Sequence, residues 1–217
     1  MKNAMAYILI LILATACNAQ TVLKSDEIIK NLASGKAMKI KGAVIDGDLD
    51  FNKIESMRTN GNIYFEKCVF KGNVKAEGVR FDGNVVFFAS EFQKDVDFQN
   101  VSIFGTVNFS KSIFKGKAIF ANSAVWAKNS YFCEMKAHDR FSLEGSDFHG
   151  DLSLMDSEFS DDFSLQETFV LGNLQGSNTK FNGGTDFSKL SVLRRTIFKY
   201  ATFKNEPNFS NSKITRE

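Results

Sequence analysis

The sequence predicts an all-β solenoid, a rod in which the chain coils repeatedly around one core. An eleven-residue unit fills residues 35–214, and its clearest copies are 193–203 (LRRTIFKYATF) and 204–214 (KNEPNFSNSKI). Sixteen such units and four extra residues, at 57–59 and 126, account for the whole span. Positions 4, 6, 9 and 11 of each unit are apolar or small and never charged, although 24% of the chain is charged. These positions predict a buried lattice.

The spacing within each unit predicts very short strands. Positions 4 and 6, and then 9 and 11, lie two residues apart, which places both side chains of a pair on one face of an extended segment. Successive pairs follow at steps of five and six residues, so the chain must turn after each pair. About 22 residues then close a four-sided coil, and we expect about eight coils, stacked into a rod of roughly 38 Å at the usual strand spacing.

Glycine and phenylalanine follow the same register. Position 2 is Gly in nine units, and we expect these glycines to supply a positive φ at the longer corner. Twenty of the 23 Phe residues occupy inward positions, ten of them at position 6. We therefore expect Phe51, Phe65, Phe87, Phe98, Phe109, Phe120 and Phe132 to stack inside the rod.

The five-residue steps carry a family resemblance. A small residue stands two before a Phe in Ser112 and Phe114, in Ser157 and Phe159, and in Ala201 and Phe203. This pattern resembles the pentapeptide-repeat family over about 180 of the 217 residues. The resemblance implies a right-handed quadrilateral β-helix. The chain departs from that family in alternating five-residue with Gly-bearing six-residue steps, and in preferring Phe to Leu.

Residues 1–19 are expected to be an export signal rather than part of the fold. Lys2 is followed by an apolar run, Ala4 to Leu13, that is too short to span a bilayer. Two modes of cleavage remain open. Residues 13–17 (LATAC) resemble a bacterial lipoprotein box ending in a lipidated Cys17, whereas ordinary cleavage after Ala19 would leave Gln20 first. Both place the mature protein outside the cytoplasm, in the periplasm or at the outer membrane.

Residues 20–34 are expected to form an N-terminal capping helix. Ser25 suits the N-cap, Ile28, Ile29 and Leu32 share one face, and Gly35 ends the pattern. The helix would cover the open end of a single solenoid domain, residues 35–214, and residues 215–217 would be a short tail. The extra residues at 57–59 and 126 are interpreted as corner bulges.

Charge is more informative in its distribution than in its sum. The formal net charge is only +2, which argues against nucleic acid as a partner. No Lys or Arg lies between Arg140 and Lys180, and we expect the acids of that segment to form an acidic belt around the rod. The belt consists of Glu144, Asp147, Asp151, Asp156, Glu158, Asp161, Asp162 and Glu167. After Ser188 the chain is mainly basic.

The sequence holds no recognisable catalytic set, CxxC motif or phosphate-binding loop, so no enzyme activity and no cofactor are predicted. Cys68 is expected in the core and Cys133 on the surface, too far apart for a disulfide. His138 and His149 are expected on opposite sides of the rod. The belt is interpreted either as solvated corners, as a surface for a cationic protein, or as a Ca²⁺ site near Glu144 and Glu167.

Three classes of function follow. The favoured prediction is a non-catalytic exported solenoid that acts as a structural or protein-binding module of the bacterial envelope. The alternative comes from the family resemblance, which implies a DNA-mimic protein that binds a type II topoisomerase. The third is a polysaccharide-cleaving enzyme with paired carboxylates. We expect an unidentified protein partner, no nucleic acid, and membrane contact only through a lipid at Cys17.

The C-terminal end is expected to remain uncapped. Its last unit turns Pro207, Phe209, Ser212 and Ile214 inward, and only residues 215–217 follow. An open strand edge can pair with another chain. The basic residues clustered at this end should oppose such pairing, so we expect a monomer or a weak C-terminal homodimer.

Overall fold

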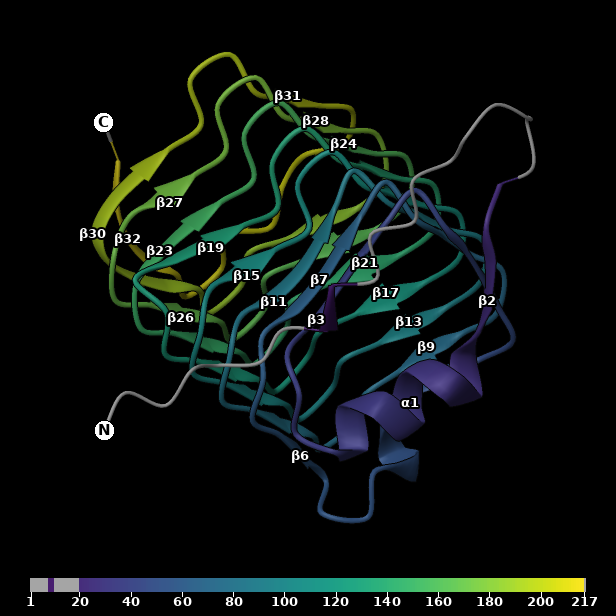
Figure 1. Cartoon of the computed structure of the whole chain (residues 1–217). Coiled ribbons are helices and arrows are strands. Elements are labelled where there is room, and N and C mark those ends of the chain that lie inside the picture. Colours follow the sequence, from purple (N-terminus) through teal and green to yellow (C-terminus); the bar gives the residue numbers. More distant parts are fainter. Residues whose placement is uncertain (1–7, 10–19, 217) are drawn as a thin grey trace.

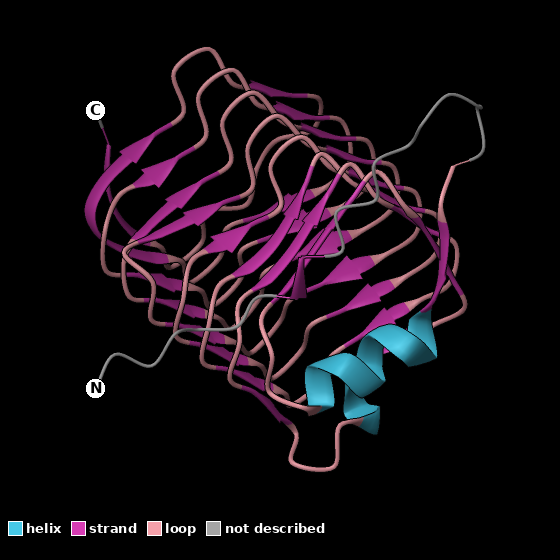
Figure 2. Cartoon of the chain, in the orientation of Figure 1, coloured by secondary structure: helices cyan, strands magenta, loops and turns pink. Residues whose placement is uncertain are grey.

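The computed structural model describes residues 8–9 and 20–216, and it forms a parallel β-solenoid with four strand-bearing faces (Figure 1). Strands of two to seven residues alternate with tight turns, and every ladder is parallel (Figure 2). The four ladders recur along the chain in a fixed order. We name each face after an early strand: the β3 face, the β4 face, the β5 face and the β6 face.

The two larger faces open each coil. The β3 face stacks β1 (Ile8–Leu9), β3 (Met38–Lys41), β7 (Ile63–Glu66), β11 (Val85–Phe88), β15 (Val107–Asn108), β19 (Asn129–Tyr131), β23 (Asp151–Ser153), β27 (Leu174–Gln175) and the end of β30 (Ser191–Ile197). The β4 face stacks β2 (Val22–Lys24), β4 (Val44–Asp46), β8 (Val69–Phe70), β12 (Glu91–Phe92), β16 (Ile113–Phe114), β20 (Lys136–Ala137), β24 (Glu158–Phe159), β28 (Lys180–Phe181) and β31 (Thr202–Phe203).

The two remaining faces complete each coil. The β5 face stacks β5 (Leu49–Asp50), β9 (Val74–Lys75), β13 (Val96–Asp97), β17 (Ala118–Ile119), β21 (Phe141–Ser142), β25 (Phe163–Ser164) and β29 (Thr185–Asp186). The β6 face stacks β6 (Arg58–Thr59), β10 (Arg80–Phe81), β14 (Ser102–Ile103), β18 (Ala124–Val125), β22 (Asp147–Phe148), β26 (Phe169–Val170), the start of β30 and the start of β32 (Lys213–Arg216). The β30 strand turns the corner and joins the β6 and β3 faces into one sheet.

The predicted solenoid is confirmed, with about nine coils rather than eight. The additional rung comes from β1 and β2, which precede the helix and pair with β3 and β4. Most coils repeat after 22 residues, as in the pairing of Val85 with Val107. The inward register is also confirmed, because all seven of the Phe side chains expected to stack are at most 4% exposed.

Helix α1 (Ser25–Ala33) lies across the N-terminal end of the solenoid, as predicted (Figure 1). It buries Ile28, Ile29 and Leu32. The expected Ser25 N-cap is wrong: Lys24 is the N-cap, without a side-chain hydrogen bond, and Ser25 is buried inside the first turn. The helix begins at once because β2 delivers the chain directly onto the end of the core.

The first insertion lies slightly earlier than predicted. Arg58 and Thr59 are strand β6, and the buried Thr59 takes the inward position that the sequence register gave to Ser56, which is exposed. The extra residues therefore loop out between Ile54 and Arg58, just after the 3-10 turn η1 (Phe51–Lys53). The second insertion follows Val125, where the coil repeat lengthens to 23 residues (Val107 pairs with Ser130).

The expected reason for glycine at position 2 is wrong. Of the nine glycines there, only Gly47 has a positive φ. The others are needed for close approach of neighbouring coils: a Cβ at Gly105 would lie 2.5 Å from the Gly83 carbonyl oxygen and 2.6 Å from the Asn84 nitrogen. The positive φ falls instead at position 8, which is mostly not glycine, as in Lys67, Ala89, Asn100, Lys111, Asn122, Glu134, Asp156, Glu167, Asn178, Lys189, Tyr200 and Asn211.

Buried hydroxyl groups at position 9 form hydrogen bonds with backbone C=O and N–H groups where the chain turns. The Ser157 hydroxyl donates to the Phe132 carbonyl one coil earlier (2.9 Å) and accepts from the Met135 backbone N–H (3.2 Å). Ser123, Ser146, Thr168 and Thr179 donate in the same way. Because an unpaired buried polar group is costly, this column explains the small hydroxyl-bearing residues of the repeat.

Candidate functional site

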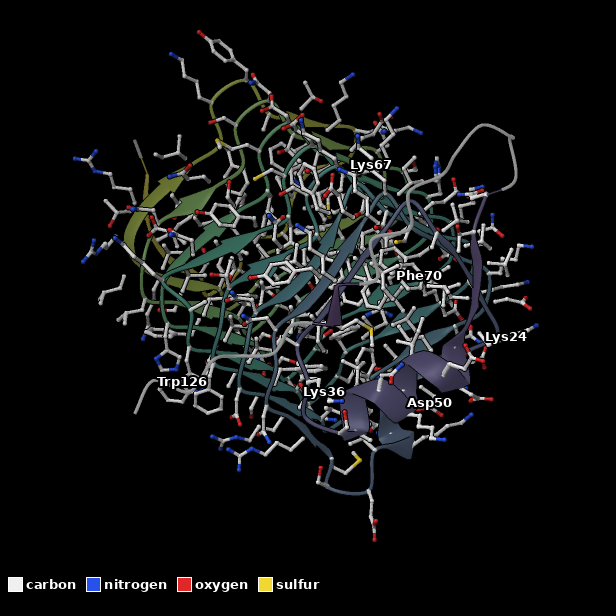
Figure 3. All side chains as sticks on the ribbon, viewed as in Figure 1. Lys24, Lys36, Asp50, Lys67, Phe70 and Trp126 are labelled. Atoms are coloured by element: carbon white, nitrogen blue, oxygen red, sulfur yellow. The ribbon has the colours of Figure 1, made fainter. Side chains whose placement is uncertain are left out.

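The most distinctive outer surface is a row of aromatic and aliphatic side chains at the corner between the β6 and β3 faces. Four of them are the first residue after a strand of the β6 face, and the fifth, Leu193, has the equivalent place inside β30, so coil stacking places them one above another. We call this row the ridge, and it consists of Phe104, Trp126, His149, Leu171 and Leu193. Figure 3 shows Trp126 at the outer edge of the molecule, away from α1.

The backbone of the ridge is fixed by the ladder of the solenoid. The Trp126 N–H donates to the Ile103 carbonyl (2.8 Å), the His149 N–H to Val125 (2.9 Å) and the Leu171 N–H to Phe148 (2.9 Å). The side chains are nevertheless well exposed, Trp126 at 51% and Leu193 at 65%. The ridge is therefore a preformed apolar surface.

The aromatic members stack on one another along the rod. The Phe104 and Trp126 rings are nearly parallel with centroids 6.0 Å apart, and the Trp126 and His149 rings lie 3.7 Å apart. The Arg80 guanidinium covers the other face of Phe104 at 4.2 Å. Since the faces of Phe104 and Trp126 are covered by neighbours, the ring edges point outward. This arrangement can bury apolar area against a partner, but it does not offer open ring faces for stacking.

Charged groups lie beside the ridge. At its N-terminal end, Asp82 accepts from Arg58 Nε (2.6 Å) and Arg80 Nε (2.8 Å), and these hydrogen bonds, Arg80 first, lower the pKa of the Asp82 carboxyl. Further along, a shallow recess adjoins the ridge. It is lined by Lys128, His149, Gly150, Asp151, Leu171, Gly172 and Arg194.

The acidic belt runs around the rod instead of forming one patch. Asp147 lies on the β6 face, Asp151 on the β3 face and Glu158 on the β4 face. The other members occupy three of the corners: Asp156 between the β3 and β4 faces, Asp161 and Asp162 between the β4 and β5 faces, and Glu144 and Glu167 between the β5 and β6 faces.

Most belt carboxylates already have partners. Glu167 pairs with Lys189 (2.6 Å) and Glu144 with Arg140 (3.7 Å), so a cation lies close to both carboxylates proposed for Ca²⁺. Asp162 accepts from the Gly184 backbone N–H at 2.8 Å. Across residues 8–9 and 20–216, no three His, Cys, Asp or Glu side chains gather as a metal site would require. Several belt members, such as Asp162, therefore also accept hydrogen bonds that join neighbouring coils.

The cysteines and histidines occupy separate environments. Cys68 and Cys133 are both free thiols, and burial raises the pKa of the Cys68 thiol. Cys68 stands at position 9 in place of a serine, with its sulfur 3.6 Å from the Ile40 carbonyl oxygen. Cys133 is half-buried and contacts Ser153 Oγ at 3.1 Å. His138 and His149 follow strands of different faces, at opposite corners.

The expected signal segment and Cys17 lie outside the described residues, apart from Ile8–Leu9. Within the described part of the chain, no helix has the length and apolar character needed to cross a membrane. Comparisons with protein-family models, with curated proteins and with solved structures gave no match. The fold and the surface are thus the basis for any functional proposal.

The ridge was missed by the sequence reasoning. In the sequence Trp126 stands out only as an insertion, and His149 only as a histidine on the side of the rod opposite His138. A usable signal exists, because Phe104, His149, Leu171 and Leu193 all stand at position 1 of alternate units. Reading outward positions at the period of a whole coil, rather than of one unit, would have aligned them.

Proposed function

We propose that this β-solenoid is a non-catalytic, exported module with a structural or protein-binding role in the bacterial envelope. The observation that carries the proposal is the exposed ridge, held rigid by the hydrogen-bonded ladder beneath it, which fits a module that docks onto another component of the envelope. Large exposed apolar surfaces on a soluble domain mark contact sites. The export half of the proposal rests on the charge and apolar pattern of residues 1–19.

The acidic belt is the second surface of the proposed module. A cationic protein is the partner that its charge favours, through contacts on faces away from the ridge. The DNA-mimic alternative gains no support from the geometry, since the acids encircle one region of the rod and two of them, Glu144 and Glu167, are paired with Arg140 and Lys189. We therefore keep the envelope module as the single proposed function.

Cell fractionation with mass spectrometry of the mature N-terminus tests export. We expect the protein in the envelope fraction, starting either at a lipidated Cys17 or at Gln20. Protein that retains Met1 and stays in the cytosol would contradict the proposal.

Site-specific photo-crosslinking tests the partner. A photoreactive residue in place of the exposed Asp161 should yield a defined protein adduct in cells. Lys94 is the matched control, because it is exposed at the same corner position three coils earlier, outside the belt. The same adducts from both positions would show that the belt has no specific partner.

A further inference from the structure

We propose that the ridge docks this protein onto the surface of an anionic phospholipid bilayer, with the rod lying along the membrane. The inference rests on the proposed function, since it presumes an exported protein beside an envelope membrane. It goes beyond a lipid anchor at Cys17, because the contact is made by the folded solenoid itself. Three features of the ridge carry it: its shape, its composition and the charges around it.

The shape of the ridge suits a soft apolar layer. The ridge follows the convex corner where each coil turns from the β6 face to the β3 face, and its five members come from five successive coils. At the strand spacing of ~4.8 Å they form a straight crest about 19 Å long. A helix or peptide ligand needs a groove, whereas a convex crest can enter the headgroup region of a bilayer directly.

The composition matches that of membrane-interface residues. Trp126 and Phe104 are 51% and 40% exposed, with Leu171 (38%) and Leu193 (65%) continuing the row. Trp is enriched where proteins meet the headgroup layer, and Phe and Leu supply the buried side of interfacial anchors. Because the backbone of the crest is held by the ladder, its side chains can enter the interface together without a folding step.

The charges beside the ridge favour an anionic surface. The outward positions on its two sides, from Arg58 to Lys213, hold more basic than acidic side chains, and one of the acids, Asp82, is neutralised by two arginines. The basic residues are Arg58, Arg80, Lys128, Arg194, Arg195 and Lys213, and the acidic ones are Asp82, Asp147 and Asp151. Of these, Lys128, Arg194 and Lys213 can reach lipid phosphates while the apolar crest inserts.

The chain carries its own reporter for the test, because Trp126 is its only tryptophan. The full chain is titrated with vesicles of phosphatidylglycerol and phosphatidylcholine, and with vesicles of phosphatidylcholine alone. We expect Trp126 emission to shift to shorter wavelength and to be quenched by brominated acyl chains in the anionic vesicles, with at least tenfold weaker binding to the neutral ones. Sedimentation with vesicles while Trp126 remains open to aqueous iodide would overturn the proposal, because another surface would then be bound.

Matched variants distinguish vesicle binding by the ridge from non-specific binding by other exposed side chains. Leu171→Ser combined with Leu193→Ser keeps the reporter and should weaken binding to anionic vesicles at least tenfold. Tyr200→Ser is the control, since Tyr200 is 73% exposed at another corner. Equal binding by the ridge variant and the wild type would refute the inference. If no vesicle alters Trp126 emission but a photoreactive residue at 126 captures an envelope protein, the ridge serves a protein and the bilayer proposal is wrong.

Discussion

Individual side chains in the core of this protein serve either packing or hydrogen bonding, according to their position in the unit. Cys68 illustrates the second role, because its thiol stands in the column where Ser and Thr hydroxyls donate to the preceding coil. Its raised pKa follows from burial and favours the neutral thiol. Cys68 is thus better explained as a structural substitute for serine than as a reactive group.

Phe109→Ala should lower the free energy of unfolding by about 3–5 kcal/mol. Phe109 is fully buried, and its ring stacks on Phe87 (5.1 Å) and Phe132 (5.5 Å) and meets Phe120 edge-on (5.0 Å). The cavity would therefore open to neighbours on several sides. Denaturant melts measure the loss, with Tyr200→Ala as an exposed control. A loss below about 1 kcal/mol would contradict the stacked core.

Asp82→Asn should destabilise the protein at pH 7 and destabilise it less at pH 2. The arginine hydrogen bonds lower the pKa of Asp82 in the folded state, so they stabilise the fold above the ordinary Asp pKa. That contribution is lost as the pH falls through the lowered value. Because both arginines are half-exposed, we expect a decrease in Tm of only about 1–4 °C at pH 7.

Thermal melts of wild type and Asp82→Asn at the two pH values provide the measurement. Asp147→Asn, at an exposed position of the adjoining β6 face, is the control. A difference in Tm that persists unchanged at pH 2 would show that the carboxylate charge is not the cause.

At the scale of the strand and turn, the corners at positions 8 and 2 of the unit have different steric requirements. The corner at position 8 needs a residue with a positive φ, and most units have Asn, Asp, Lys or another non-glycine residue there. Where position 2 is Gly, the corner needs the absence of a side chain, because the preceding coil passes against it. Spacing alone could not separate these requirements, since both produce a periodic turn residue.

Substitutions at two glycines, Gly105 and Gly78, distinguish the steric requirements of the two corners. Gly105→Ala should be strongly destabilising, because its Cβ would press on the Gly83 and Asn84 backbone. Gly78→Ala should cost only about 1–2 kcal/mol, since Gly78 has φ +71° and its Cβ would find only Met57 Cε, at 3.8 Å. Gly78→Asn should cost less still. Denaturant midpoints compare the variants, and an equal loss at Gly78 and Gly105 would refute the distinction.

The inward half of each unit was predictable, and the outward half was not. Burial restricts positions 4, 6, 9 and 11 to uncharged residues, so their register is visible in the sequence. An outward Leu193 or Phe104 obeys no such rule and resembles ordinary surface variation until the coils are stacked. Strand β2 was not predicted for a related reason: Val22–Lys24 lies outside the repeat, has no buried residue, and is a strand because it pairs with β4.

For the molecule as a whole, the two ends are unlike. The N-terminal end is covered by α1. At the other end, four apolar side chains remain half-buried: Phe198, Phe203, Phe209 and Ile214. These four side chains and the edge of the last coil form a surface suited to pairing with a second copy. Basic residues at this end oppose such pairing, notably Lys199, Lys204 and Lys213.

We therefore expect a monomer at low salt and, at most, weak C-terminal dimerisation that strengthens as salt rises. Added salt screens the repulsion between the basic ends, with a Debye length of ~8 Å at physiological ionic strength. Sedimentation across a salt series measures the association. A tight dimer at low salt that dissociates when salt is added would show that the sign of the electrostatic term is wrong.

The ladder hydrogen bonds run along the axis of the rod, from each coil to the next. Tension applied to the two chain ends would load these bonds one coil at a time rather than all together. The rod should therefore resist stretching poorly and yield in successive steps, each releasing about one 22-residue coil. An unfoldase or a translocation motor pulling on the half-open C-terminal coil would meet a sequence of small barriers instead of one large one.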